Sequence, residues 1–412
     1  MKIWIISKLE SYWSLQNLTE SIISAIKSKY DAVEYFQQDE KIDLNEISKI
    51  YRESDIVFNL SSKCMNYQKD NNKVTVFLWH AWMDHWAWIN LYRNRAFFWP
   101  NDVIAFASKS ARSKFNHVYW KSLKTVLLPY FTTFSEDSTS VDKEAIKTKY
   151  WLPTDKQLLL YHWRICEEKN IIWILDVFDS LQSSDFSIAF AWSNSELRTF
   201  WFWKSRYDSV DYADKLSKHI NDNRIKNAYF LWSLERRDLR ELISASYLNI
   251  NLSVNKEEDF WISAIESMAL WIPVVTSDWW WLKDINSWAG YCAKSELSDW
   301  FDIKLDYEGV RNFIDDISTD KKRYQKISER SLKKVKKKFS ESAFVDNFEK
   351  ILKEIKKKDI LEWIDSHSIL KPKKWIEKIY LGVLKSDNAE SIYIDNPRLF
   401  NRLYKFYASK RK

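Results

Sequence analysis

A pair of carboxylates, Glu258 and Glu266, brackets seven residues and is the sharpest chemical pattern in the sequence. The sequence predicts that a helix begins just after Phe260, and the backbone N–H groups that open a helix bind phosphate with the help of the helix dipole. Glu266 falls about two turns along this helix, where it can accept hydrogen bonds from ribose hydroxyls. Two glutamates at this spacing more often mark a solvated helix face, but a predicted turn at residues 277–281 favours a ligand site.

A pair of cations, Arg164 and Lys169, follows the predicted strand at residues 157–161. A guanidinium offers a bidentate fork and an ammonium a point charge, and together they can neutralise a diphosphate. By itself, such a pair more often lies on the solvated surface, so the prediction of a binding role depends on the motif around the pair. No Asp-x-Asp pair appears in a metal-binding context, and we expect neither a metal nor a cofactor.

The chain contains 24 tryptophans and 3 glycines among its 412 residues, whereas about 7% usage would give roughly 29 glycines. Trp280 and Trp281 follow the β-branched run at residues 274–276, where a turn favours residues that tolerate positive φ. Other tryptophans fall at predicted ends of helices or strands, namely Trp151, Trp232 and Trp271. We therefore hypothesise that most tryptophans stand at glycine positions, because some bacterial lineages read the codon UGA as glycine. A deliberate substitution and a genuinely tryptophan-rich protein are the alternatives.

Short β-branched or apolar runs alternate with helical patterns along the chain, which is typical of parallel sheets covered by helices on both faces. A polar stretch near residues 135–150 is typical of a linker between two such units. We predict an α/β protein of two Rossmann-like doubly wound domains facing across a cleft, at residues 1–145 and 150–335, followed by a helical, basic segment at residues 336–412. The predicted strands lie at residues 2–7, 55–60, 74–78, 103–107, 125–128, 157–161, 186–191, 228–231, 247–252 and 273–277.

Composition narrows the class of protein. No apolar run reaches the roughly 20 residues that span a bilayer, and no signal peptide is visible. The three cysteines lie far apart without C-x-x-C spacing, which argues against disulfides and zinc and fits a reducing cytoplasm. The net charge of +7 comes largely from C-terminal lysines, for which a solvated helix face is commoner than a nucleic-acid or membrane surface. Residues 397–407 are basic and apolar, so they fit either an anionic membrane or the protein's own body.

Several of these segments together resemble the retaining glycosyltransferases of GT-B architecture, family 4 type. The E-x-F-G-x4-E hallmark matches at Glu258, Phe260 and Glu266, with Trp261 at the glycine place. Residues 266–275 resemble the family's EAMALGIPVV, residues 277–282 its S/T-x-x-G-G-L, and residues 163–170 its GR(L/I)xxEKN. The resemblance covers roughly residues 1–350 and is most specific at 158–290.

The resemblance implies a role for each matched residue. Arg164 and Lys169 would neutralise the leaving diphosphate, and Glu266 would bind the ribose. Glu258 would act at the catalytic centre by contacting the donor sugar near its 3- and 4-hydroxyls. The remaining donor-binding positions would bring backbone close to the donor, and these are Phe260, Trp261, Ile262, Trp280 and Trp281.

The first domain resembles the family less specifically. His80 and His85 follow a predicted strand, and the family often has a histidine there near the donor sugar, so His80 is the first catalytic choice and His85 the second. A polar loop histidine without a role is the alternative. Trp13 matches the glycine-bearing loop between donor and acceptor, with one candidate glycine position in place of the frequent pair.

The implied reaction is transfer of a sugar from a nucleotide-diphosphate sugar to an acceptor hydroxyl, with retention of configuration. We expect a bacterial enzyme of cell-surface polysaccharide or glycolipid synthesis, with an acceptor sugar or lipid-linked glycan as partner and no nucleic acid. Its expected location is the cytoplasm, including peripheral contact at the inner face of the plasma membrane. The alternatives are an epimerase or phosphorylase of the same fold, or a non-catalytic carbohydrate or membrane binder that stacks ligands on its tryptophans.

Overall fold

The structure is a computed structural model of the 412-residue chain. It describes residues 2–8, 13–37, 44–60, 74–79, 102–118, 124–135, 141–163, 165, 169–181, 185–191, 209–231, 234–254, 262–279, 282–297 and 303–356.

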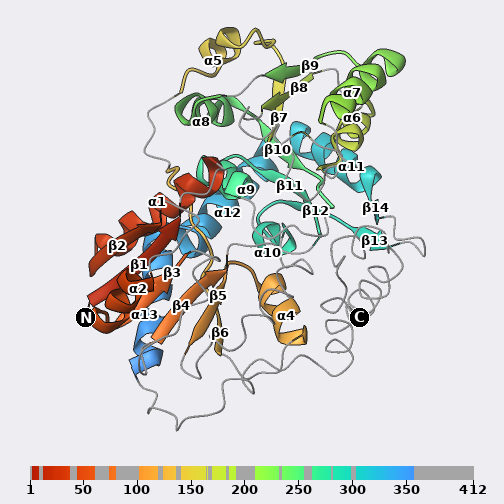
Figure 1. Cartoon of the computed structure of the whole chain (residues 1–412). Helices are drawn as coiled ribbons and strands as arrows, with labels where there is room; N and C mark the ends of the chain where they lie inside the picture. Colours follow the sequence, from red (N-terminus) through yellow and green to blue (C-terminus); the bar gives the residue numbers. More distant parts are fainter. Residues whose placement is uncertain are drawn as a thin grey trace.

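The first domain is built on a six-stranded sheet whose strands pair in parallel in the order β2-β1-β3-β4-β5-β6. Described helices connect β1 to β2, β2 to β3 and β5 to β6, as parallel pairing requires (Figure 1). Its elements are β1 (Lys2–Lys8), α1 (Trp13–Lys27), β2 (Asp31–Gln37), α2 (Leu44–Glu53), β3 (Ile56–Asn59), β4 (Val74–Trp79), β5 (Val103–Phe106), α4 (Lys109–Val118) and β6 (Lys124–Leu127).

The second domain repeats this plan around a parallel sheet of order β12-β11-β10-β7-β8-β9. Its strands are β7 (Gln157–His162), β8 (Phe186–Ala191), β9 (Ala228–Leu231), β10 (Leu248–Asn251), β11 (Val274–Ser277) and β12 (Tyr291–Ala293), beside the small antiparallel pair β13 (Ser295–Leu297) and β14 (Ile303–Leu305). Its helices are α5 (Lys143–Lys149), α6 (Ile171–Asp179), α7 (Ser209–Asn223), α8 (Arg236–Ala245), α9 (Ile262–Ala269), α10 (Leu282–Asn286), α11 (Tyr307–Thr319) and α12 (Lys321–Lys338).

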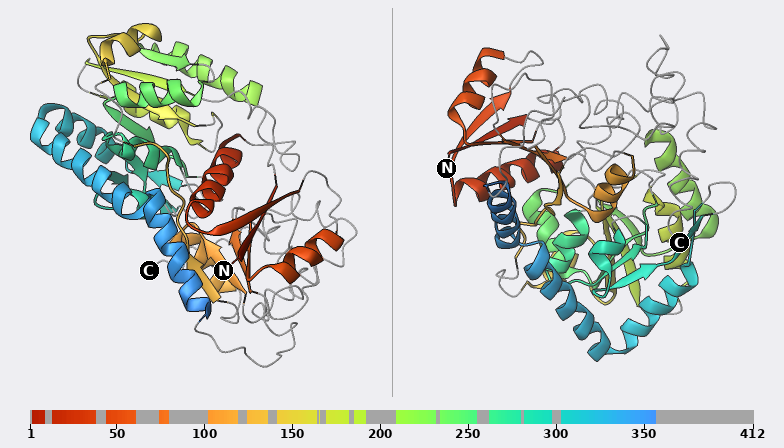
Figure 2. Two further views of the ribbon diagram at one scale, coloured as in Figure 1. Left: turned by 90° about the vertical axis from the view of Figure 1, so that its left-hand side faces the viewer. Right: turned by 90° about the horizontal axis from the view of Figure 1, so that it is seen from below.

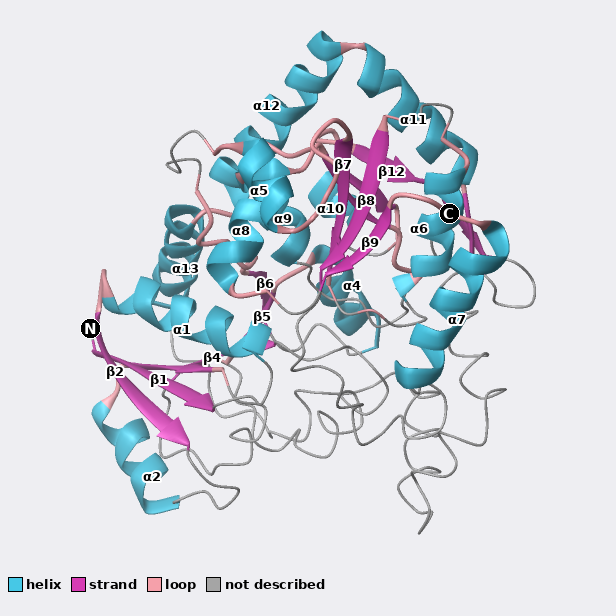
Figure 3. Ribbon diagram, turned by 90° about the horizontal axis from the view of Figure 1, so that it is seen from above, coloured by secondary structure: helices cyan, strands magenta, loops and turns pink. Residues whose placement is uncertain are grey.

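The central strands of the second sheet are buried on both faces, and β7 and β8 accordingly consist mainly of apolar residues. Side chains alternate along β7, so Leu158 and Leu160 pack into one core and Leu159 and Tyr161 into the other. Figure 3 shows α5, α8 and α9 on one side of this sheet and α6, α7 and α11 on the other.

The chain passes between the two domains twice, and the two crossings lie side by side. The first crossing runs from Leu128 to Ser135, and its Thr132 N–H donates to the carbonyl of Phe339, which follows α12, at 3.1 Å. Beyond Phe339, α13 (Glu341–Lys356) returns to the first domain, where Phe344 and Phe348 are buried in the core beneath its sheet. The left view of Figure 2 shows α13 lying along the first domain.

Among the described residues, three tryptophans adopt positive φ, namely Trp151 (54°), Trp271 (67°) and Trp288 (65°). Trp151 ends α5 in a Schellman motif, because its N–H donates to Thr148 and the next N–H donates to Lys147. Trp271 ends α9 in the same way, because its N–H donates to the carbonyl of Met268 and the N–H of Ile272 donates to that of Ser267. Glycine usually occupies this left-handed position, because a Cβ is strained there.

The predicted fold class is confirmed, and each strand predicted from the sequence is present within a residue or two of its expected bounds. The prediction missed the edge strands β2 and β12 and the short pair of β13 and β14. The segment predicted as a linker, residues 135–150, contains α5. Asp142 caps the N-terminus of this helix, because its side chain accepts hydrogen bonds from two backbone N–H groups. The domain boundaries remain predictions. Within the described ranges, no helix combines the length and apolarity needed to cross a membrane.

Candidate active site

The carboxyl ends of β7 and β10 mark the topological switch point of the second sheet. From β7 the chain adds β8 and β9 on one side, then crosses back to place β10 and β11 on the other. Ligands of doubly wound proteins bind outside the strand ends at such a point. α9 begins just beyond the end of β10, so its N-terminus lies at this edge.

Glu266 is the best-defined carboxylate of the site. It lies on α9 with its side chain 7% exposed. Its Oε1 accepts a hydrogen bond from Arg236 Nη1 at 3.2 Å, and its Oε2 lies 3.7 Å from His162 Nε2. The carboxylate is therefore held beside one permanent cation and one titratable ring, and it keeps capacity to accept further hydrogen bonds.

His162 ends β7 and is buried against Asn249 of β10. Asn249 Nδ2 lies 2.8 Å from His162 Nδ1. An amide nitrogen donates, so Nδ1 is the acceptor and the neutral ring carries its proton on Nε2, facing Glu266. In the described part of the chain, neither this Nε2 nor the buried Ser263 Oγ, in the first turn of α9, has a hydrogen-bond partner. Both polar atoms have hydrogen-bonding capacity to offer a ligand.

Lys169 lies in the turn between β7 and α6 and is buried. The next residue, Asn170, has left-handed backbone (φ 56°), and its side-chain amide donates to the carbonyl of Leu252 at 2.8 Å. Since Leu252 follows β10, this bond holds the turn that carries Lys169 against the strand that leads into α9. The predicted cation and the predicted carboxylate thus follow neighbouring strands.

Ile262 opens α9 at the boundary between the domains. It packs against the second-domain core that contains Ile265 and Met268, and also against the first-domain core. Trp13 opens α1 after β1, next to the switch point of the first sheet. The other predicted site residues lie outside the described residues, and these are His80, His85, Arg164, Glu258, Phe260, Trp261, Trp280 and Trp281.

The sequence analysis missed Arg236 and His162. His162 carried a usable signal, because it directly follows a predicted strand and stands two residues before Arg164. Arg236 carried no such signal, because its hydrogen bond to Glu266 joins residues on two different helices that are 30 positions apart in the sequence. Within the described ranges no cluster of three or more His, Cys, Asp or Glu side chains could hold a metal ion.

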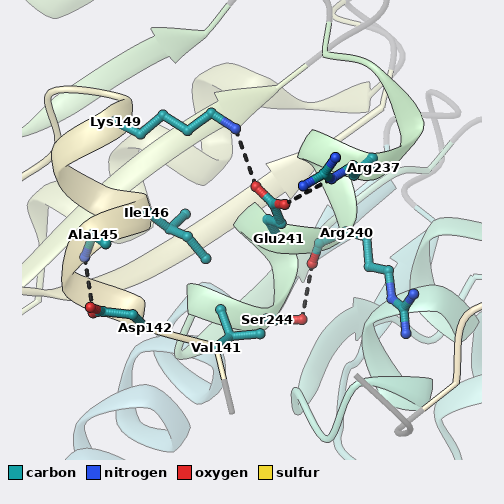
Figure 4. A pocket seen from close by; sticks show the side chains of 9 residues that line it. All are labelled: Val141, Asp142, Ala145, Ile146, Lys149, Arg237, Arg240, Glu241 and Ser244. Carbon is teal, nitrogen blue, oxygen red and sulfur yellow. Dashed lines mark hydrogen bonds and ion pairs between the residues drawn. The ribbon is translucent and has the colours of Figure 1, made fainter. Parts of the chain in front are cut away.

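A groove of about 570 Å³ between α5 and α8 lies apart from this site (Figure 4). Its charged groups largely pair with each other, since Lys149 bonds to Glu241 at 3.1 Å and Arg237 bonds to the same carboxylate at 3.3 Å. None of Glu266, His162 and Lys169 lines it. The lining residues are Val141, Asp142, Ala145, Ile146, Lys149, Arg237, Arg240, Glu241 and Ser244.

Solved structures similar to this chain share its two-domain architecture. The UDP complex of Anabaena Alr3699/HepE superposes with a TM-score of 0.65 at 12% identity, covering 86% of this chain and 100% of that one. A glycosyltransferase from Rickettsia africae ESF-5 gives 0.65 at 13% identity, covering 87% and 99%. WaaG, a glycosyltransferase involved in lipopolysaccharide biosynthesis, gives 0.56 at 12% identity, covering 85% and 99%.

At the level of sequence, residues 142–331 match the protein family described as Glycosyl transferases group 1. No curated protein matches the chain. The matched residues include the turn with Lys169, the start of α8 and the whole of α9. Residues 142–331 thus form a Glycosyl transferases group 1 domain, and the chain is a glycosyltransferase enzyme of GT-B fold.

Proposed function

We propose that this enzyme transfers a sugar from a nucleotide-diphosphate sugar to an acceptor hydroxyl. The observation that carries the proposal is the buried carboxylate of Glu266, on the helix that begins at the switch point between β7 and β10. A carboxylate with remaining lone pairs suits the two hydroxyls of a ribose. Support also comes from the similar Anabaena protein, whose structures are complexes with UDP and UDP-glucose.

The proposed reaction breaks the bond between the anomeric carbon and the diphosphate and forms a bond from that carbon to the acceptor oxygen. The acceptor proton passes to the departing phosphate oxygen, and retention follows if attack and departure use the same face. Lys169 and Arg164 stabilise the negative charge that develops on the diphosphate, together with the N-terminus of α9. No protein-bound metal or cofactor has a role in this scheme.

The remaining assignments follow the sequence resemblance to family 4. Glu258 holds the donor sugar hydroxyls, and the backbone at Phe260, Trp261 and Ile262 approaches the donor phosphate. His80, with His85 as second choice, acts near the donor sugar, and the loop before Trp13 lies between donor and acceptor. Trp280 and Trp281 form the second turn of the donor site.

For the biological setting, we propose a bacterial pathway of cell-surface polysaccharide or glycolipid synthesis. The acceptor would be a sugar or lipid-linked glycan, and the enzyme would work in the cytoplasm or at the inner face of the plasma membrane. The segment proposed for membrane contact, at residues 397–407, lies outside the described residues.

We also propose that most tryptophans stand at glycine positions of the native protein. Left-handed backbone at Trp151, Trp271 and Trp288 supports this, as does the side-chain exposure of Trp151, which reaches 88%. An indole at position 261 would fill the space that a donor phosphate needs. The gene provides the test: UGA codons are expected at these positions, and UGG codons would contradict the proposal. Below, the glycine form means the chain with glycine at positions 151, 163, 261, 271, 280, 281 and 288.

The donor site is tested by replacing Glu266 in the glycine form. We expect Glu266→Ala to weaken nucleotide binding at least about tenfold, because hydrogen bonds to a charged group contribute about 1.5–3 kcal/mol. Isothermal titration with UDP, GDP and ADP measures the affinity and identifies the nucleotide. Glu329→Ala, on the exposed face of α12, is the control. Equal affinity of the Glu266→Ala and Glu329→Ala proteins would refute the assignment.

A further inference from the structure

Arg236 makes contacts in two directions from the first position of α8. Its Nη1 donates to Glu266 Oε1 at 3.2 Å, and its Nη2 donates to Thr133 Oγ1 at 2.7 Å. Its guanidinium also lies 4.5 Å from the centre of the Phe134 ring. A guanidinium is a rigid, planar fork, so the two hydrogen bonds fix the positions of Glu266 and Thr133 relative to each other.

Thr133 belongs to the first crossing between the domains, at the place where the chain changes from one core to the other. Phe131 is buried in the first-domain core, where its ring lies 5.1 Å from that of Phe344. Phe134, three residues later, is buried in the second-domain core. We call residues 131–134 the pivot, because any relative movement of the domains must pass through this segment and the adjacent second crossing.

The pivot is also fixed from its other sides. The N–H of Phe134 donates to Thr132 Oγ1 at 3.0 Å, and the N–H of Thr132 donates to the carbonyl of Phe339 at 3.1 Å. One turn after Arg236, Arg240 Nη2 donates to the carbonyl of Ser135 at 3.0 Å. The side of α8 that carries Arg236 and Arg240 therefore holds the pivot, and of these two arginines Arg236 also reaches the donor-site carboxylate.

We propose that Arg236 is a positioning residue that couples donor binding at Glu266 to the order of the pivot. This rests on the proposed function, in which Glu266 binds the donor ribose. A ribose that donates to Glu266 restrains the carboxylate, the carboxylate restrains the guanidinium, and the guanidinium restrains Thr133. Coupling between two sites is reciprocal, so an ordered pivot also strengthens nucleotide binding.

A double-mutant cycle in the glycine form tests the coupling, with UDP as the probe. Arg236→Gln should weaken UDP binding about tenfold, and Thr133→Val should weaken it a few-fold, because the Thr133 hydroxyl accepts from Arg236. The double variant should bind no more weakly than Arg236→Gln alone, because the two changes break one chain of contacts. Additive losses would overturn the proposal.

Hydrogen exchange gives a readout that a merely structural arginine would not alter. UDP should slow amide exchange in residues 128–135 of the glycine form and of its Arg237→Gln variant. In the Arg236→Gln variant, UDP should no longer slow exchange in these residues. Arg237 is the matched control, because it is the next residue and its side chain bonds to Glu241. Unchanged UDP protection in Arg236→Gln would overturn the coupling. If the glycine form and its Glu266→Ala variant bound UDP equally well, the assignment of Glu266 as the ribose-binding residue would itself fail.

Discussion

At the scale of single residues, Glu266 and Lys334 are two buried charged residues in contrasting surroundings. Glu266 lies between Arg236 and His162 at a strand end, where a ligand can use it. Lys334 of α12 is fully buried away from that site, and its Nζ donates to the carbonyl and hydroxyl oxygens of Ser287 at 2.8 and 3.1 Å. Burial lowers the pKa of Lys334 to about 8. Its charge therefore lowers the stability of the fold at neutral pH, whereas the Glu266 carboxylate is held beside a cation.

Lys334 predicts a specific pH dependence of stability. The folded pKa lies below the unfolded value, so the unfolded chain binds more protons between about pH 8 and 10.5, and stability rises with pH in that window. The cost of the charge is fully present below pH 8. We expect the unfolding free energy of the parent, relative to Lys334→Met, to rise on the order of 2 kcal/mol from pH 7 to pH 10. Urea unfolding measures it, with the exposed neighbour variant Lys333→Met as control; a pH-independent difference would contradict the burial effect.

At the scale of elements, helix ends and strand edges decide what the sequence can predict. Central strands such as β3 and β11 are buried throughout and are visible as apolar runs. Among the edge strands of the two six-stranded sheets, β6 and β9 were predicted. β2 escaped prediction because it carries Glu34 among its apolar residues, and β12 because it has only three residues. The helix beginning after Phe260 was predicted correctly as α9, which places Glu266 on it, whereas the role of Glu266 in binding stays a prediction. Arg236 could not be predicted, because its role depends on how α8 packs against α9 and the first crossing.

The Schellman motif at the end of α9 predicts an unusual order of stability at position 271. Alanine is ordinarily more favourable than glycine because it restricts the unfolded chain. At position 271, however, a residue with a Cβ must adopt a φ of 67°, which costs roughly 1–2 kcal/mol for an L-residue. We therefore expect Trp271→Gly to be about 1 kcal/mol more stable than Trp271→Ala. Both variants lack the indole, so the comparison isolates the backbone; greater stability of the alanine variant in urea unfolding would contradict it.

At the scale of the whole molecule, α13 is the element that completes the first domain. Phe348 is fully buried, and its ring lies 5.0 Å from that of Phe58 on β3 and 5.9 Å from that of Tyr30. The first core thus depends on a helix that the chain reaches only after the entire second domain.

Truncating that ring should destabilise the first domain selectively. We expect Phe348→Ala to lower its unfolding free energy by about 3–5 kcal/mol, since it leaves a cavity in a packed core. In calorimetry that resolves two transitions, Phe348→Ala should lower the temperature of the first-domain transition and leave the second-domain transition nearly unchanged. Lys350→Ala, at an exposed position on the same helix, is the control. An equal shift of both transitions would mean that the two domains unfold as one unit.

The adjacent crossings have a consequence for how this architecture can be recombined. Because Thr132 and Phe339 are hydrogen-bonded neighbours, the second domain is an insertion whose two ends meet at one place in the first. Such an insertion can be exchanged as a cassette through two splice points, while the host keeps its sheet and its final helix. If the second domain binds the donor, as proposed, a change of donor nucleotide requires no rebuilding of the first domain.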